Sequence, residues 1–290
     1  MTNDINPAMA SRISTTLLLL FFSGILFSCS KSDGTPATTT PPVLVPSGYT
    51  LSYEDSIFFL QDQAADYIVS PKQTLAGSYS GFPEGIEIDG KTGAINVSKS
   101  ETGLRYRISF IPTGSKDTFN TVILISGINF LDGFYKLNTN DSILRPIYNA
   151  DINISIPGTS NGSVFDEGAG CNNAGCNVNT AVGSINLAQT VRNGVFGTTP
   201  SNNDRHEFQL NYRINDKSGK ALNTLKVKLY YFDSIDDVTQ EVYDIITSRA
   251  GTLLRAGAAP INFSSVVNGR VDGLKQSAKP RPPCIFILAR

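Results

Sequence analysis

The stretch GFPEGIEIDGKTGAINV, residues 81–97, contains two short runs in which apolar and polar residues alternate, with a turn between them. Ile86 and Ile88 alternate with their neighbours in the first run, and Ile95 and Val97 resume the alternation in the second. Residues 89–93, DGKTG, supply the Asp and Gly that tight turns prefer. Because alternation with a period of two is typical of strands that bury one face, this stretch predicts a β-hairpin.

Strand-like runs continue on both sides of this hairpin. IFFL, DYIVS, YRISFI and TVILISGI lie between residues 57 and 128, are rich in β-branched and aromatic residues, and are separated by turn residues. Several short strands at this spacing predict a β-sandwich over residues 48–130. The alternative is that the hairpin belongs to some other all-β fold.

The same residues resemble the cadherin-like, immunoglobulin-like domains of bacterial surface proteins. The recurring element of that family is a Pro-x-Gly step, an apolar strand, an Asp turn containing Thr-Gly, and a second strand. Here it is carried by Pro83, Gly85, Ile86, Ile88, Asp89, Thr92, Gly93 and Ile95, and residues 103–111, GLRYRISFI, fit the family's next strand. The resemblance implies a spacer or binding module rather than a catalyst. Cadherins bind calcium through acidic motifs at repeat junctions; these motifs are not matched here, so the resemblance carries over no calcium ligands.

The composition excludes several classes of function. The 290 residues include 24 Lys and Arg against 25 Asp and Glu, for a net charge of −1. Nucleic-acid-binding proteins need clustered Lys and Arg to neutralise phosphates, so we expect no nucleic-acid partner. His206 is the only histidine, which excludes a two-histidine metal site or a haem pair.

An apolar run precedes the predicted strands. Residues 17–27 are uncharged, and the run is shorter than the roughly 20 residues that cross a bilayer as a helix. Arg12 lies before this run and Ser28 ends it. This layout predicts a secretory signal peptide over residues 1–28.

The end of that run resembles the bacterial lipoprotein box, in which a small residue is followed by an obligatory cysteine. The matching residues are Leu26, Phe27, Ser28 and Cys29, with Phe27 bulkier than the usual residue at its position. The resemblance implies that Cys29 receives a diacylglycerol thioether, that cleavage occurs before it, and that its new amine is acylated. The alternative is an ordinary signal peptide cut nearby, which would leave Cys29 as an odd thiol.

A spacer follows the predicted lipidation site. Residues 29–47 are rich in Pro, Thr and Ser, which cannot bury a core, and consecutive prolines favour extended geometry. The signal, Cys29 and this linker predict a lipid-anchored protein of the cell envelope, in the outer membrane and facing the periplasm or the cell surface.

Residues 131–290 contain two clear strands. HEFQLNYRIND, residues 206–216, and LKVKLYYF, residues 225–232, each alternate apolar and polar side chains. The apolar positions are Phe208, Leu210, Tyr212 and Ile214 in the first strand and Leu225, Val227, Leu229 and Tyr231 in the second. The turn-rich DKSGKALN between them predicts an antiparallel pair with one face in water.

An amphipathic helix is predicted after these strands. Asp237 and Gln240 have the spacing of a capping box, and Gly251 is the expected end. The apolar stripe is Val238, Val242, Ile245 and Ile246. CIFILAR, residues 284–290, predicts a buried strand. Residues 131–290 are therefore expected to form a β-rich α+β domain, and they resemble no family that we recognise.

Two cysteines lie in the Gly- and Asn-rich loop of residues 163–183. Cys171 and Cys176 are separated by four residues, and in an exported protein the expected pairing is a disulfide. The alternative is a zinc site that adds Cys284 and His206. It is disfavoured because Cys284 lies in an apolar strand and is predicted to be a buried thiol.

Carboxylates offer other candidate sites. Asp166-Glu167 could bind a hard cation such as calcium, although the spacing does not match an EF-hand loop and such pairs are more often solvated. Glu54-Asp55 and Asp236-Asp237 are the other adjacent carboxylates, and glycoside hydrolysis needs two at a defined separation. We assign no catalytic, cofactor-binding or metal-binding residues.

Asp-Ser-Ile occurs three times and resembles a short acceptor motif for bacterial O-glycosylation. It would modify Ser56, Ser142 and Ser234. Asp-Ser is also common in turns, so chance is the alternative explanation.

The sequence favours a non-catalytic binding, adhesion or assembly module that needs no cofactor. Its expected partners are the membrane, through the lipid anchor, and a protein or glycan ligand. One alternative is a hydrolase of envelope or extracellular polysaccharide with unidentified carboxylates. Another is a structural subunit of a surface complex.

Overall fold

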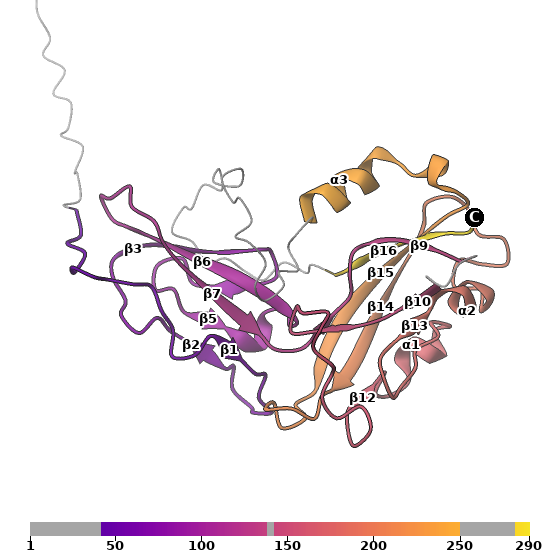
Figure 1. Ribbon diagram of the computed structural model, residues 1–290, viewed down its shortest axis with the longest axis horizontal. Coiled ribbons are helices and arrows are strands. Elements are labelled where there is room, and N and C mark those ends of the chain that lie inside the picture. Colours follow the sequence, from indigo (N-terminus) through magenta and orange to yellow (C-terminus); the bar gives the residue numbers. More distant parts are fainter. Residues whose placement is uncertain (1–41, 138–141, 250–281) are drawn as a thin grey trace, which may run out of the picture. The chain divides into compact units, whose positions relative to one another are not determined.

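The computed structural model describes residues 42–137, 142–249 and 282–290 (Figure 1). The described residues all belong to one compact unit. Strands form most of the regular structure and the helices are few, which confirms a mainly β fold. Cys29, the signal peptide, most of the linker and Gly251 lie outside the described residues.

The first seven strands form two sheets. Their bounds are β1 Ile57–Phe58, β2 Ile68–Val69, β3 Gly77–Phe82, β4 Glu87–Ile88, β5 Ile95–Asn96, β6 Leu104–Pro112 and β7 Phe119–Ile125. The sheet orders are β1-β7-β6-β3 and β2-β5-β4, and only β1 with β7 pairs in parallel. If the seven strands are lettered A to G in chain order, the two sheets have the strand orders A-G-F-C and B-E-D. This is the strand arrangement of an immunoglobulin-type sandwich, so the predicted sandwich is confirmed.

The hairpin predicted for residues 81–97 is present. Ile88 pairs with Ile95 across antiparallel β4 and β5. In the turn, the Asp89 side chain accepts hydrogen bonds from the backbone N–H of Lys91 (2.9 Å) and of Thr92 (2.8 Å). Gly93 has φ +72°, and a Cβ there would approach the Tyr79 ring to 2.6 Å. The turn therefore depends on one carboxylate and one glycine.

β6 carries a further mark of this fold. Its side chains alternate between buried and half-buried positions along the whole strand. The hydroxyl of Tyr106 donates to the backbone oxygen of Glu101 at 2.7 Å. A tyrosine near the start of strand F that bonds a few residues upstream is the tyrosine corner of immunoglobulin-type sandwiches.

The sandwich has one core, filled from both sheets. Tyr79 of β3 stacks on Phe110 of β6 with ring centroids 4.4 Å apart, and fully buried isoleucines from the hairpin complete the core. Two residues of the predicted linker also belong to this unit. Val43 N–H donates to Thr113 O at 2.8 Å, and Val45 packs against the core.

The other described residues are arranged around a five-stranded mixed sheet of order β12-β14-β15-β16-β9. These strands are β9 Gly133–Lys136, β12 Val164–Phe165, β14 Asp204–Arg213, β15 Asn223–Phe232 and β16 Cys284–Leu288. The shorter strands are β8 Ile128–Asn129, β10 Ile143–Leu144, β11 Ile147–Tyr148 and β13 Ile185–Asn186. The helices are α1 Gly170–Asn173, α2 Leu187–Arg192 and α3 Gln240–Arg249, with single 3₁₀ turns at Val97–Lys99 and Ile235–Asp237. The predicted β-rich α+β architecture is confirmed.

The antiparallel pairing of β14 with β15 is as predicted, but the exposed face was only partly right. Phe208 pairs with Val227, and the apolar face is buried beneath α1 and α2. On the other face, Lys226 is exposed as expected, whereas Tyr230 is buried beneath α3. The prediction of a wet face is therefore wrong at the end of β15, because α3 packs its apolar stripe there.

The helix itself confirms the predicted stripe and corrects its start. Val238, Val242 and Ile245 pack in the core beneath α3. The prediction that Asp237 caps the helix is wrong, because the chain forms a 3₁₀ turn first and α3 begins only at Gln240. The Asp237 carboxylate instead accepts a hydrogen bond from the Ser234 hydroxyl at 2.6 Å.

The last strand is buried along its entire length, as CIFILAR predicts. Its place in the sheet was not predicted. β16 runs parallel to β15 on one side and to β9 on the other, with Phe286 paired to Tyr230 and to Phe134.

We predict that the Asp89 turn contributes to stability in a pH-dependent way. Asp89→Ala should lower the free energy of unfolding by about 1 kcal/mol at neutral pH, because two backbone N–H groups lose a charged acceptor. Backbone hydrogen bonds from Thr92 and Lys91 lower the pKa of Asp89. A carboxyl whose pKa is lower in the folded state than in the unfolded state stabilises the folded protein at pH values above the unfolded pKa. This stabilisation is lost as the pH falls through the folded pKa.

Urea denaturation at neutral and at acid pH would measure this effect. Asp89→Asn keeps one acceptor oxygen without the charge, so it should lose less stability than Asp89→Ala. The gap between wild type and Asp89→Asn should close as the pH falls. A gap that does not change with pH would contradict this account.

Candidate functional site

Asp166, one of the candidate cation ligands, is buried at the start of the loop that carries α1. One carboxylate oxygen accepts from Cys171 N–H at 2.8 Å, and the other accepts from Asn172 N–H at 2.9 Å and Asn172 Nδ2 at 2.7 Å. Both oxygens are therefore engaged by the first turn of α1. Asp166 holds this loop in shape and is not arranged as a cation ligand.

Its neighbour Glu167 turns away to a different partner. The Glu167 carboxylate lies 2.6 Å from Nε of Arg213, and this hydrogen bond raises the pKa of Arg213. Arg213 also donates from Nη1 to Lys220 O at 2.8 Å. The two adjacent carboxylates thus do not converge on one point.

Cys171 and Cys176 are free thiols in the structure, so the predicted disulfide is not present in it. The short helix α1 ends in a pair of characteristic hydrogen bonds. Cys176 N–H donates to Cys171 O at 2.9 Å, and Gly175 N–H donates to Asn172 O at 3.0 Å. With Gly175 at φ +90°, these bonds make a Schellman motif.

Burial controls the chemistry of both thiols. The Cys171 thiol donates to Gln209 O at 3.3 Å, and both side chains belong to the core beneath β14. Burial raises the pKa of Cys171 and raises the pKa of Cys176 to about 12. Because the thiolate is the reactive form, the folded protein should shield both from alkylating reagents.

The four soft ligands considered for zinc are not brought together. Cys284 lies in the core beneath α3, on the opposite face of the sheet from Cys171 and Cys176. His206 is half-buried at the start of β14, with its ring centroid 4.5 Å from that of Phe208. Among the described residues, no group of three or more His, Cys, Asp and Glu side chains is placed to hold a metal ion.

The other predicted positions lie apart from one another. Asp55 accepts from the N–H groups of Ser56 (2.6 Å) and Ile57 (3.2 Å), which lower the pKa of Asp55. Ser56 is exposed, while Ser142 and Ser234 are half-buried. Glycosylation of these three serines stays a prediction.

A buried polar cluster that the sequence did not indicate lies between the sandwich core and the core of the mixed sheet. The hydroxyl of Tyr212, from β14, lies 2.8 Å from the Thr102 hydroxyl and accepts from Ile128 N–H at 3.2 Å. Asn223 Nδ2 donates to the same Thr102 oxygen at 3.0 Å. A Cβ on Gly127 would come within 2.7 Å of the Tyr212 oxygen, so glycine permits this close approach.

The cluster extends to a second set of side chains. Tyr148 donates to Asp216 at 2.7 Å, and the Ser126 hydroxyl lies 2.9 Å from Asn149 Oδ1. A cavity of about 10 Å³ beside it is lined by Leu60, Ser126, Gly127, Tyr212, Ile214, Asp216, Ser218, Ala221 and Asn223. That volume suits about one water molecule and is too small for a sugar.

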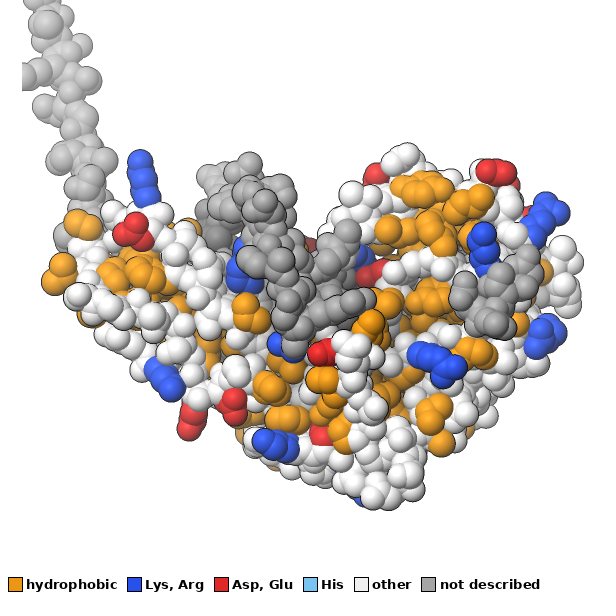
Figure 2. All heavy atoms as spheres, viewed as in Figure 1, with side chains coloured by type: hydrophobic (Ala, Val, Ile, Leu, Met, Phe, Trp, Pro, Cys, Tyr) orange, Lys and Arg blue, Asp and Glu red, His pale blue; other side chains and the backbone are white. Residues whose placement is uncertain are grey.

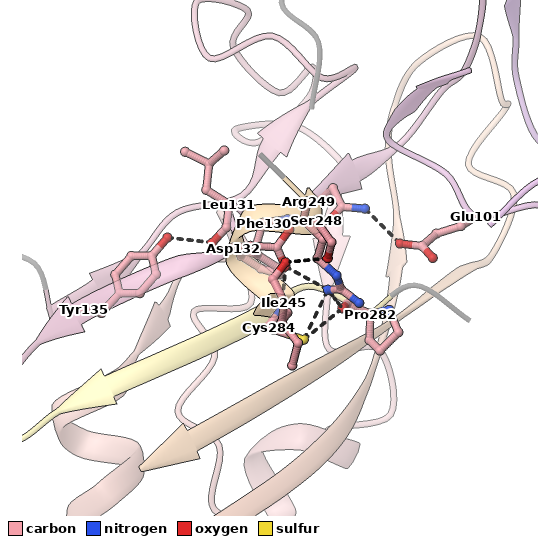
Figure 3. A network of polar contacts seen from close by, with 11 residues as sticks. Glu101, Phe130, Leu131, Asp132, Tyr135, Ile245, Ser248, Arg249, Pro282 and Cys284 are labelled. Carbon is pink, nitrogen blue, oxygen red and sulfur yellow. Dashed lines mark hydrogen bonds and ion pairs between the residues drawn. The ribbon is translucent and has the colours of Figure 1, made fainter. Parts of the chain in front are cut away.

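A second buried cluster joins the end of α3 to the sheet (Figure 3). Arg249 Nη1 lies 3.0 Å from Asp132, 2.7 Å from Pro282 O and 3.1 Å from the Cys284 sulfur. Asp132 also accepts from Cys284 N–H at 2.7 Å. Burial raises the pKa of Cys284, which suppresses the thiolate despite the nearby guanidinium. These contacts hold the end of α3 against the start of β16, and we call the group of Asp132, Arg249, Pro282 and Cys284 the clasp.

Several charged side chains on the surface form ion pairs between neighbouring elements. Lys226 lies 2.9 Å from Glu207, and Arg205 makes two hydrogen bonds to Glu241 on α3. On the face shown in Figure 2, basic and acidic side chains are interspersed rather than gathered by sign. The described residues therefore form no extended region of one charge on this face.

We predict that the Tyr212 hydroxyl contributes strongly to stability. Tyr212→Phe should lower the free energy of unfolding by about 1–3 kcal/mol, because Ile128 N–H then stays buried without an acceptor. Tyr243→Phe removes a hydroxyl from a half-exposed ring and should change the free energy of unfolding little. Equal denaturation midpoints for the two variants would contradict this role.

The two ends of α3 offer a matched comparison of ion pairs. Asp132→Ala should cost about 2–4 kcal/mol, because it removes the carboxylate that pairs with the mostly buried Arg249 charge and accepts the Cys284 N–H. Glu241→Ala breaks an exposed pair that solvent screens, so it should lower the free energy of unfolding much less. Thermal or urea unfolding would measure both, and an equal loss at the two ends would refute the assignment of the clasp.

No protein-family model and no curated protein sequence matches the chain. Two crystal structures of human protocadherin-24 EC1-2 each cover 62% of this chain. They match over 96% and 94% of their own length, at 9% and 10% identity and TM-scores of 0.21 and 0.23. Domains 3–5 of the Drosophila OTK extracellular region cover 62% of this chain and 61% of that one, at 12% identity and a TM-score of 0.20. These similarities are too low to carry an argument, so the sandwich is assigned from its own strand order and tyrosine corner.

Proposed function

We propose that this chain is a non-catalytic binding, adhesion or assembly module of a bacterial cell envelope. The observation that carries the proposal is an immunoglobulin-type sandwich joined by buried hydrogen bonds to a second β-rich unit. Sandwiches of this type recur in many cell-surface domains, where exposed edges and loops bind partners. A fold of this type supports a class of function and does not identify a ligand.

The candidate catalytic groups support the same proposal. Asp166 and Asp55 accept hydrogen bonds from backbone N–H groups, and Asp237 accepts one from Ser234. Burial raises the pKa of the Cys171 thiol. These groups are used to hold loops and turns, which is a different task from proton transfer or nucleophilic attack.

We further propose that a lipid on Cys29 anchors the mature chain. The support is the coincidence of a signal-like apolar run with a small residue and a cysteine at its end. Several acyl chains hold a protein at a membrane far more firmly than one chain does. Within the described ranges, no helix has the length and apolar character that a membrane crossing requires.

Metabolic labelling with an alkyne fatty acid tests the anchor. Labelled wild type and unlabelled Cys29→Ala are the expected pair of results, and Cys284→Ser is the matched control that should keep the label. Protease added to intact cells then distinguishes display on the surface from a periplasmic orientation. An unlabelled wild type would overturn the proposed anchor.

Incubation of the purified protein with isolated envelope polysaccharide separates binding from hydrolysis. For a binding module, saturable cosedimentation without new reducing ends is the expected result. New reducing ends in proportion to protein concentration would favour the hydrolase alternative instead.

A further inference from the structure

The two cysteines of the loop occupy special positions in the cap of α1. In a Schellman motif, the side chains of the residue that donates the outer hydrogen bond and of the residue that accepts it are frequently in contact. In this chain those residues are Cys176 and Cys171, joined by the 2.9 Å bond from N–H to carbonyl oxygen. Gly175, at φ +90°, is the glycine that the motif requires between them.

The surroundings hold both cysteines in place without a covalent bond. Asp166 accepts the Cys171 N–H on one side. On the other side, Asn172 accepts from Val178 N–H at 3.0 Å and donates back to Val178 O at 3.1 Å. Because the backbone on both sides is fixed, closing a bond between the sulfurs costs little further order.

We propose that Cys171 and Cys176 form a disulfide once the chain meets an oxidising compartment, a step that rests on the proposed export. Each thiol loses a proton, one S–S bond forms, and two electrons pass to a disulfide-bearing oxidant, which is reduced to two thiols. The thiol-to-Gln209 hydrogen bond is given up in this step. Cys284 takes no part, because it lies on the other face of the sheet within the Arg249 clasp.

Thiol counting on the purified full chain tests the proposal. The protein is refolded from guanidinium in oxidised glutathione, so that the thiols meet the oxidant before they are buried, and is then unfolded in guanidinium that contains iodoacetamide and mapped by peptide mass. Cys284 should be alkylated before reduction, and Cys171 and Cys176 only after it. Alkylation of all three without reduction, or glutathione adducts on Cys171 and Cys176, would overturn the proposal.

A matched pair of variants tests whether the cap is the cause. Gly175→Ala places a Cβ in a left-handed conformation and 3.1 Å from Val195 Cγ2. It should lower the equilibrium constant for closure about tenfold. Ala174→Gly, one residue earlier with φ −86°, should leave closure nearly unchanged. Equal closure in the two variants would rule out the Schellman geometry as the reason for pairing.

Protein recovered from cells separates this inference from the proposed anchor, because fatty-acid label and thiol state are read on one sample. Labelled protein whose three described cysteines all react without reduction would overturn the disulfide and leave the anchor standing. Unlabelled protein that carries the disulfide would overturn the anchor and leave the disulfide standing. If neither is found, the glutathione experiment decides the pairing.

Discussion

The hydroxyl of Tyr212 occupies the point where the two halves of the structure meet. It is hydrogen-bonded to Thr102, which lies just before β6 of the sandwich, and to Ile128 at the start of the second unit. A buried hydroxyl must find partners or lose the free energy of its hydration. The chain between Ser126 and Phe130 is therefore not a free linker. Ser126 and Ile128 are hydrogen-bonded to the second unit, and Asn129 donates to Glu101 of the sandwich.

The chemistry of this junction differs from that of the junctions between cadherin repeats. Cadherins use acidic side chains and calcium between successive repeats, whereas the groups here are mainly hydroxyls, amides and backbone N–H. The carboxylates at this junction, Asp216 and Glu101, accept hydrogen bonds from Tyr148 and Asn129, and a cavity of about 10 Å³ leaves room for little more than one water molecule. The second unit is also no repeat of the first, because its sheet is mixed and is covered by helices on both faces.

Several carboxylates in this protein hold the backbone in place by accepting hydrogen bonds from its N–H groups. Asp89 closes the hairpin turn, Asp166 holds the start of α1, and Asp132 joins the start of β16 to the end of α3. Short strands leave many N–H groups outside the sheets, and a charged acceptor satisfies them well. Of these three, only Asp166 has an adjacent carboxylate, Glu167, and the two side chains have separate partners, α1 and Arg213.

Local periodicity let the sequence by itself determine the hairpin of residues 81–97, the β14–β15 pair and the apolar stripe of α3. Each needs only neighbouring residues to decide which face is buried. Tertiary structure alone decided the place of β16 between β15 and β9, the burial of Tyr230 and the Tyr212 cluster. Their partners lie far apart along the chain, and no local pattern encodes which distant strand or helix will cover a given face. The cap of α1 stands between these cases: the sequence shows a glycine before Cys176, but only the folded backbone sets that cysteine opposite Cys171.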